Sequence, residues 1–432
     1  MDDVIGSMAG RPYVATAYER FFLSDDIFHL IISLAYNARV IRSEDGFTEV
    51  SYGALIEGIG STCKDWRVLV KDLLMRDGQA YLVAFGAAAA AECLSAFPQA
   101  RSLRIEGTDC TDEVAAAIAS RSVERVKLRP AEMRTLGRLG ALSSLRALYL
   151  PACYELADLG SLSALVGLRT LDLRMCKQFS GNVRSLSALV SLHTLTLTSS
   201  WKLHDVRPLS TLVGLHTLRL HDSLSLKDLR PLSTLVRLHT LDLSGCPEIT
   251  DVRPLSALAA LRNLDLHGSD HVLDLRPLSA LVGLRTLDLR DCVELQTVQP
   301  LSALAGLRIL NLQHCSALHD VGPLSTLVAL HTLNLRECFA VGDVRPLSTL
   351  GGLHTLNLCH CHRVSDVRPL STLSGLNTLN LSWCTSLFDV RALSALVGLR
   401  ALDLRRCNVR DLRPLSVLSN LTLQAPEDPY TA

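Results

Sequence analysis

Leucines recur along most of this chain in one fixed pattern of apolar and polar positions. Residues 330–338 read LHTLNLREC, and the spacing L-x-x-L-x-L-x-x-C returns about every 23 residues. Within it, T-L-N-L-R alternates apolar and polar residues with a period of two, which is typical of a short, half-buried strand. The alternation predicts that Leu333 and Leu335 point into a core while Asn334, between them, faces outward.

The residues before each predicted strand carry a second pattern. The stretch P-L-S-T-L-V-G-L spaces its leucines for a turn of helix, with proline at the first position, where a missing N–H has no consequence. The aspartate of the preceding D-V-R, as at Asp343, is placed to cap that turn with its carboxylate. Each unit therefore predicts one short helix followed by one short strand.

The unit repeats with a nearly constant length. Counted from Pro208, the equivalent position returns in steps of 23 as far as Ala392, and a last step of 22 leads to Pro414. Two degenerate units, ARSLRI (100–105) and VERVKL (123–128), precede the regular ones. A fixed period of this length indicates a solenoid, in which each unit buries its apolar face only against its neighbours.

The L-x-x-L-x-L-x-x-C unit resembles the cysteine-containing leucine-rich repeat, and the resemblance covers about residues 93–423. It implies an α/β repeat solenoid of about 15 units. Such a solenoid is a curved horseshoe with short parallel strands on its concave face and short helices on its convex face. Residues 1–92 do not repeat and are expected to form a small α-helical domain. Residues 424–432 are expected to be a disordered tail.

A cysteine returns three residues after the last strand leucine of most units. It allows three interpretations: a metal ligand, a reactive thiol, or a staple, meaning a small buried residue that bonds to nearby backbone. Serine replaces it at Ser200, Ser223 and Ser269, and serine shares its size but not its affinity for soft metals. A buried staple is therefore favoured. Cys359 is expected to face outward and to be the most reactive repeat thiol. The run LCHCH (358–362) could suggest zinc, but consecutive residues seldom converge on one ion, so neither a metal nor a cofactor is expected.

The outward positions of the strands offer candidate partner-binding residues. They either form a solvated face that balances its own charges or a polar groove for a protein partner. Their side chains are expected to be exposed, so changes at Asp265 or Asp288 would alter stability by less than about 0.5 kcal/mol. The predicted concave-face set is Asp172, Asp242, Asp265, Asp288, Arg290, Asn311, Asn334, Arg336, Asn357, Asn380, Trp383 and Asp403.

The non-repeating segment contains two helical patterns, over 23–35 and 52–74. Together they resemble an F-box (residues 18–75), because the apolar spacing of the first is followed by Cys63-Lys64 and Trp66. The resemblance implies a substrate receptor of an SCF-type ubiquitin ligase, with a Skp-type adaptor and a cullin as partners. The adaptor-contacting residues it implies are Leu23, Ile27, Leu30, Ile31 and Trp66. The alternatives are a plain helical cap and a stand-alone scaffold or regulatory binding protein with no ubiquitin role.

Composition narrows the function classes further. Lys and Arg total 43, as do Asp and Glu, and this balance disfavours nucleic-acid binding. The longest apolar stretch, 80–97, is rich in alanine and contains Glu92, so no membrane span is expected. Thirteen cysteines without an export signal favour a reducing, cytoplasmic or nuclear location. No catalytic motif stands out, and a non-enzymatic protein-binding role is expected.

Overall fold

The computed structural model describes residues 49–51, 81–85, 90–91, 94–95, 100–106, 111–119, 121–129, 134, 136–176 and 183–426. These residues belong to two compact units, Met1–Pro130 and Ala131–Ala432. The two degenerate repeats therefore group with the first unit, although the sequence places the domain boundary at residue 93. The helices expected over 23–35 and 52–74 lie outside the described residues.

The described part of the first unit includes a parallel sheet and the helix α7. Its strands are β1 (Glu49–Ser51), β2 (Tyr81–Phe85), β3 (Ser102–Glu106) and β4 (Arg125–Arg129), paired in that order. Helix α7 (Thr111–Ala119) connects β3 to β4 and places Asp112 and Glu113 in its first turn, where negative charge is favourable. β3 and β4 coincide with the two degenerate repeats, whereas β1 and β2 are strands that the predicted helical domain does not include.

No helix among the described residues is long and apolar enough to cross a membrane.

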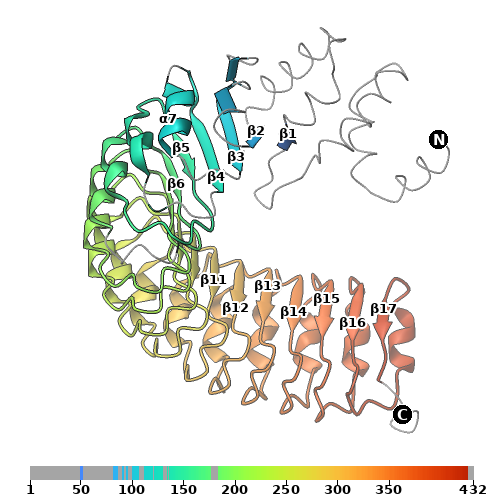
Figure 1. Ribbon diagram of the computed structural model, residues 1–432. Helices are drawn as coiled ribbons and strands as arrows, with labels where there is room; N and C mark the ends of the chain where they lie inside the picture. The colour runs from blue at the N-terminus through green and yellow to red at the C-terminus, as the bar shows by residue number, and fades with distance from the viewer. Residues whose placement is uncertain are drawn as a thin grey trace, which may run out of the picture. The chain divides into compact units, whose positions relative to one another are not determined.

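The second unit is a stack of three-residue parallel strands in a single register. Corresponding leucines lie beside each other, as Leu264 does beside Leu287. Figure 1 shows these strands side by side on one face of the stack, with the helical turns on the opposite face. The strands are β5 (Ala147–Tyr149), β6 (Thr170–Asp172), β7 (Thr194–Thr196), β8 (Thr217–Arg219), β9 (Thr240–Asp242), β10 (Asn263–Asp265), β11 (Thr286–Asp288), β12 (Ile309–Asn311), β13 (Thr332–Asn334), β14 (Thr355–Asn357), β15 (Thr378–Asn380), β16 (Ala401–Asp403) and β17 (Thr422–Gln424).

Each strand places leucines in the core with a period of two. Leu333 and Leu335 are completely buried, and Asn334 between them is half-buried. The backbone pairing continues beyond the three strand residues: in the β15 repeat the N–H groups of Leu381 and Trp383 donate to the next repeat at 2.9 and 2.8 Å. The alternation predicted from the sequence is therefore confirmed, and the inter-repeat ladder is longer than the strands themselves.

The predicted helices of the opposite face are only single 3-10 turns of five residues. Leu209 N–H donates to Val206 O, and Leu212 N–H donates to Leu209 O, both at 3.0 Å. The apolar residues of this segment are spaced by three, which fits the three-residue turn of a 3-10 helix better than the 3.6 of an α-helix. The turns are η1 (Gly137–Ala141), η2 (Gly160–Ala164), η3 (Arg184–Ala188), η4 (Arg207–Thr211), η5 (Arg230–Thr234), η6 (Arg253–Ala257), η7 (Arg276–Ala280), η8 (Gln299–Ala303), η9 (Gly322–Thr326), η10 (Arg345–Thr349), η11 (Arg368–Thr372), η12 (Arg391–Ala395) and η13 (Arg413–Val417).

An Asp–Arg pair starts many of these turns, as the sequence predicts for Asp343. The Asp343 carboxylate accepts the Arg345 N–H at 2.9 Å and pairs with the Arg345 guanidinium at 2.7 Å. The same arrangement holds the pKa of Asp274 down at about 2, because Arg276 donates hydrogen bonds to its carboxylate. The pairs are exposed, so they contribute little to stability beyond capping the turn.

In most repeats the recurring cysteine joins its repeat to the one before it. The Cys338 thiol donates to Leu312 O at 3.0 Å. Leu312 is the last strand leucine of the preceding repeat. Burial raises the pKa of the Cys338 thiol to about 12, so it remains a protonated donor. The predicted buried staple is confirmed, and the same S–H···O contact occurs at Cys176, Cys246, Cys292, Cys315, Cys361, Cys384 and Cys407.

Cys359 departs from the expectation of an exposed, reactive thiol. It is only 6% exposed, and the Ser382 hydroxyl of the next repeat donates to its sulfur at 3.0 Å. An outward strand position is therefore covered when the neighbouring repeat reaches over it. Among the described residues no group of three or more His, Cys, Asp or Glu side chains could hold a metal ion.

Serine is a poorer staple than cysteine at the same position. Ser223 and Ser269 are completely buried, and their hydroxyls bond to no described residue. The C–O bond is shorter than the C–S bond, so the hydroxyl stops short of the carbonyl that a thiol reaches. An unsatisfied buried hydroxyl costs about 1–3 kcal/mol.

We expect Ser223→Cys to raise the free energy of unfolding by about 1 kcal/mol, because the thiol restores the missing contact. Cys338→Ser should lower it by a similar amount. Urea unfolding followed by circular dichroism measures both changes, and Ser374→Cys on the exposed turn surface is the matched control. An unchanged or lowered stability of Ser223→Cys would contradict the staple.

Candidate functional site

The polar residues between the strand leucines end the strands. Asp265 Oδ1 accepts the backbone N–H of His267 at 3.0 Å, and Asn380 Oδ1 accepts that of Ser382 at 2.9 Å. The same bond to the residue two positions later is made by Asp172, Asp242, Asp288, Asn311, Asn334, Asn357 and Asp403. These side chains are half-buried, or buried at Asp172. The expectation that they are freely exposed is therefore wrong, and each has a structural role.

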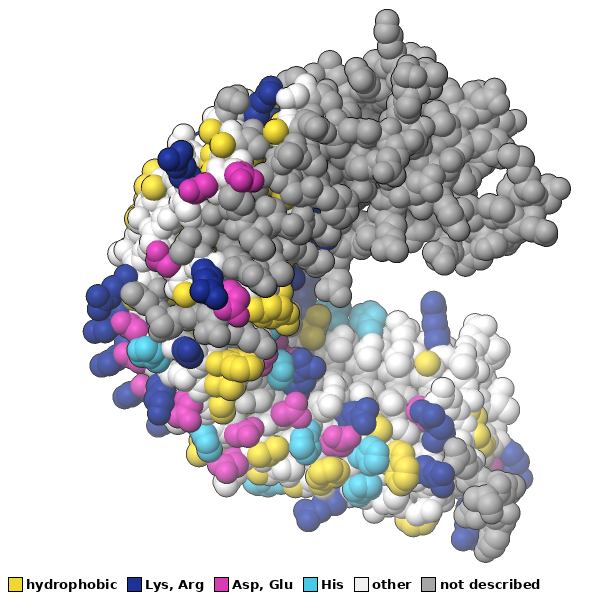
Figure 2. Space-filling view, viewed as in Figure 1, with side chains coloured by type: hydrophobic (Ala, Val, Ile, Leu, Met, Phe, Trp, Pro, Cys, Tyr) yellow, Lys and Arg dark blue, Asp and Glu magenta, His cyan; other side chains and the backbone are white. Residues whose placement is uncertain are grey.

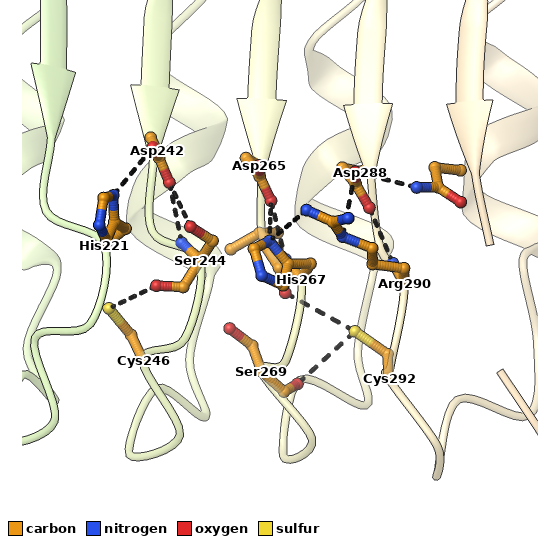
Figure 3. Close-up of polar contacts among 12 residues, drawn as sticks. His221, Asp242, Ser244, Cys246, Asp265, His267, Ser269, Asp288, Arg290 and Cys292 are labelled. Carbon is orange, nitrogen blue, oxygen red and sulfur yellow. Dashed lines mark hydrogen bonds and ion pairs between the residues drawn. The ribbon is translucent and has the colours of Figure 1, made fainter. Parts of the chain in front are cut away.

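Asp242 is held by two neighbours, shown in Figure 3. The Ser244 hydroxyl donates to its Oδ1 at 2.6 Å, and His221 Nδ1 lies 3.7 Å from its Oδ2. Burial works to raise the pKa of Asp242, but the hydrogen bonds from His221 and Ser244 outweigh it, and the pKa is lowered. The bond to Asp242 in turn raises the pKa of His221.

The carboxylates of Asp265 and Asp288 also have partners within the protein (Figure 3). Asp265 lies 3.0 Å from His267 Nδ1. Asp288 lies 3.6 Å from Arg290 Nε and accepts the Asn311 amide at 3.0 Å. Burial, reinforced by the nearby charge of Asp265, raises the pKa of Asp288. Each carboxylate in this half of the row therefore has partners within the protein, and Figure 2 shows acidic and basic side chains interspersed over the visible described surface.

The row becomes uncharged from Asn311 to Asn380. Asn334 Nδ2 donates to Gln313 at 3.3 Å. Asn357 and Asn380 use Oδ1 for the strand end, and no described residue accepts from their Nδ2 groups. Two amide donors on adjacent strands β14 and β15 are therefore available to a bound chain.

Beside this uncharged stretch runs an aromatic strip, defined here as His314, Phe339, His360, His362, Trp383 and Arg406. Ring centroids are 5.8 Å apart for Phe339 and His362 and 4.9 Å apart for His360 and Trp383, and both pairs are stacked. The two histidines meet edge to face at 5.6 Å, and the Arg406 guanidinium lies 5.6 Å from the Trp383 ring centroid. The strip follows the carboxyl ends of β12 to β16, and Trp383 is 41% exposed.

Most residues of the strip occupy one unusual backbone position, immediately before the staple. His314, His360 and Trp383 have φ values of 59, 61 and 63°, in the left-handed region. Glycine fills this position only at Gly245 and Gly268, where φ is 62 and 66°. The sequence identifies Trp383 but not His314 or His360, although all three occupy the same position relative to the strand leucines of their repeats.

The other predicted residues are placed in two ways. Arg336 pairs with Glu337 at 2.9 Å, and Asp403 pairs with Arg405 at 2.7 Å, so both have partners within the protein. The predicted adaptor-contacting residues, Leu23, Ile27, Leu30, Ile31 and Trp66, lie outside the described residues. The run Cys359–His362 does not converge on one point, because Cys361 bonds Leu335 O while His360 stacks on Trp383.

The stacked strands, 3-10 turns and leucine core define the leucine-rich-repeat fold, as the sequence predicts. An internalin (InlF) from Listeria monocytogenes is similar, with a TM-score of 0.59 and 22% identity over 72% of this chain and 88% of the internalin. A leucine-rich-repeat protein of Leptospira interrogans, LIC12759, has a TM-score of 0.57 and 17% identity over 79% and 99%. The functional domain of InlJ from Listeria monocytogenes, which includes a cysteine ladder, has a TM-score of 0.53 and 18% identity over 78% and 68%. At these identities the likeness concerns the fold.

No protein-family model and no curated protein matches the sequence.

The strand-end role predicts different effects for two substitutions of the same aspartate. Asp288→Asn keeps the oxygen that accepts the Arg290 N–H, so the melting temperature should hold. Asp288→Ala removes that oxygen and should cost about 1 kcal/mol. Thermal unfolding of both variants measures the difference, and equal stability would contradict the strand-end role.

The His221–Asp242 pair predicts a measurable titration. The His221 pKa should lie above 6.5 and should fall in Asp242→Asn, while the distant Asp403→Asn leaves it unchanged. Because the folded pKa is raised, the stabilisation from protonated His221 is complete below the unfolded pKa and is lost as pH rises through the folded value. NMR titration of the imidazole, assigned with His221→Gln, measures the shift. An unshifted or lowered pKa would show that the pair does not form.

Proposed function

We propose that this chain is a protein-binding scaffold with no catalytic step of its own. Its partner lies along the aromatic strip and the uncharged strand ends of β12 to β16. The observation that carries this proposal is the strip itself: rings from successive repeats stack into one surface that leaves Trp383 and Phe339 41% and 38% exposed. Aromatic side chains and arginine are enriched among the residues that dominate binding energy.

The surroundings of the strip support a preformed site. The strand-end bonds fix Asn357 and Asn380, so their amide donors need no reordering when a partner arrives. The charged row at Asp242, Asp265 and Asp288 is engaged internally, which favours the carboxyl-terminal repeats as the contact region. The described cysteines are free thiols, and this agrees with the proposed reducing, cytoplasmic or nuclear location.

The test places a photo-crosslinking residue at His362 and, as the control, at Ser256 on the turn face. We expect a partner captured from His362 but not from Ser256. With that partner purified, Trp383→Ala combined with Phe339→Ala should weaken binding by at least about tenfold, because buried aromatic anchors are each worth about 2 kcal/mol or more. Val417→Ala, on the turn face, serves as the surface control. Undiminished affinity of the double variant would reject the strip as the contact surface.

A second candidate function makes the chain a substrate receptor of an SCF-type ubiquitin ligase. It rests on the F-box-like spacing of Leu23, Ile27 and Ile31, followed by Trp66, in the segment that precedes the repeats. In this case the repeats would hold the protein to be ubiquitinated, and the adaptor would bind the amino-terminal segment.

The adaptor prediction is tested by co-purification with a Skp-type adaptor and a cullin. The full chain should retain both, and Ile27→Asp with Trp66→Ala should lose both while the Trp383→Ala variant keeps them. Failure of the unmodified full chain to bind any Skp-type adaptor would leave the scaffold without a ubiquitin role.

A further inference from the structure

In the second unit, the residue directly before each of the strands β5 to β16 belongs, with one exception, to a row of arginines and histidines along the amino-terminal edge of the sheet. This basic edge lies at the opposite ends of the strands from the aromatic strip, and acidic residues are absent from it. Over β5 to β16 its members are Arg146, Arg169, His193, His216, His239, Arg262, Arg285, Arg308, His331, His354 and Arg400, and Asn377 is the one interruption.

The charge of the basic edge is not balanced within the described part of the protein. The guanidinium of Arg285 donates to Gly306 O at 2.7 Å, a neutral acceptor. Neither it nor Arg262 or Arg308 forms an ion pair with any described carboxylate. The arginines of the 3-10 turns contrast with them, since Arg253 and Arg276 each pair with an aspartate at 2.8 Å. Like charges repeated at strand spacing repel each other unless an anion lies against them.

An exposed apolar row accompanies the basic edge. Three residues before each basic residue, in the same loop, a valine is left largely in solvent in most repeats. Val190, Val213 and Val236 are 57, 52 and 53% exposed and belong to consecutive repeats. The other members are Val166, Val282, Val328 and Val397, with exposures of 56, 66, 59 and 81%. A partner that fits both rows needs acidic and apolar groups side by side.

The spacing of the basic edge identifies the shape of such a partner. The stacked rings of His193, His216 and His239 are 5.1 and 5.2 Å apart, and those of His331 and His354 are 5.2 Å apart. One turn of an α-helix rises about 5.4 Å. Alternate residues of an extended strand are about 6.6 Å apart, so their register with the repeats is lost within a few units.

From these rows we propose that the basic edge docks an acidic amphipathic α-helix that lies along the stack, with one turn per repeat. A carboxylate from each turn meets an arginine or histidine, and an adjacent apolar residue covers a valine. A nucleic acid offers the negative charge but not the apolar row beside it. This inference is independent of the proposed function, since it concerns the other edge of the sheet.

The test uses the full chain and a synthetic 21-residue helix, about six turns long, labelled with fluorescein. The peptide carries glutamate once per turn and leucine in the adjacent stripe, and binding is followed by fluorescence anisotropy. We expect Arg262→Gln/Arg285→Gln/Arg308→Gln to weaken binding by about tenfold or more. The control Arg230→Gln/Arg253→Gln/Arg276→Gln removes the same charge from the turns and should change affinity by less than about twofold.

Three further measurements decide the nature of the partner. Val213→Ser with Val236→Ser should weaken peptide binding about fivefold, because apolar contact is lost. A peptide of the same composition with the two stripes scrambled should bind poorly. Equal binding of the scrambled peptide, or of an oligothymidylate of equal charge, would overturn the proposal in favour of a general polyanion surface. The proposal would be overturned outright if the striped peptide did not bind, or if the two triple-arginine variants lost affinity for it equally.

Discussion

No repeat of this protein can bury its own leucines, and every other feature depends on the contact of one repeat with the next. The leucine core requires neighbours in register, and polar bonds fix that register on both faces. On the strand side, the Cys361 thiol reaches Leu335 O at 3.1 Å. On the turn side, the Thr349 hydroxyl reaches Ser325 O at 2.7 Å. Because these bonds link adjacent units only, stability is expected to accumulate step by step along the stack.

The sequence predicts the fold well because its strongest signal is the period of the leucines, and the burial of these leucines is also the largest contribution to stability. Strand position, the direction of Leu333 and Leu335 and the Asp343 cap all follow from local pattern. The 3-10 turns could also have been predicted, since the spacing of three between Val206, Leu209 and Leu212 fits a 3-10 helix better than an α-helix. The burial of Cys359 was not predictable, because the side chain that covers it, Ser382, belongs to the following repeat. An alternation of period two gives the face of the sheet on which a residue lies, but not whether a side chain of the next repeat covers it.

The candidate site shows the same limit more sharply. Asp265 and Asn334 look like a free polar ladder in the sequence, yet their oxygens are used to end strands. The sequence indicates only Trp383 of the aromatic strip, because the strip combines two offsets, before the staple as at His360 and after it as at His362, whose rings meet only when the repeats stack. A repeat sequence therefore shows which positions face outward, but not which of them the backbone has already engaged.

The left-handed residue before each staple has a consequence for any attempt to regularise this protein. A redesign for stability would place glycine there, as at Gly245 and Gly268, and would relieve a backbone cost of about 1 kcal/mol at each site. The same replacement would erase His314, His360, Trp383 and Arg406. Selection for thermostability and selection for recognition would thus act on the same positions in opposite directions.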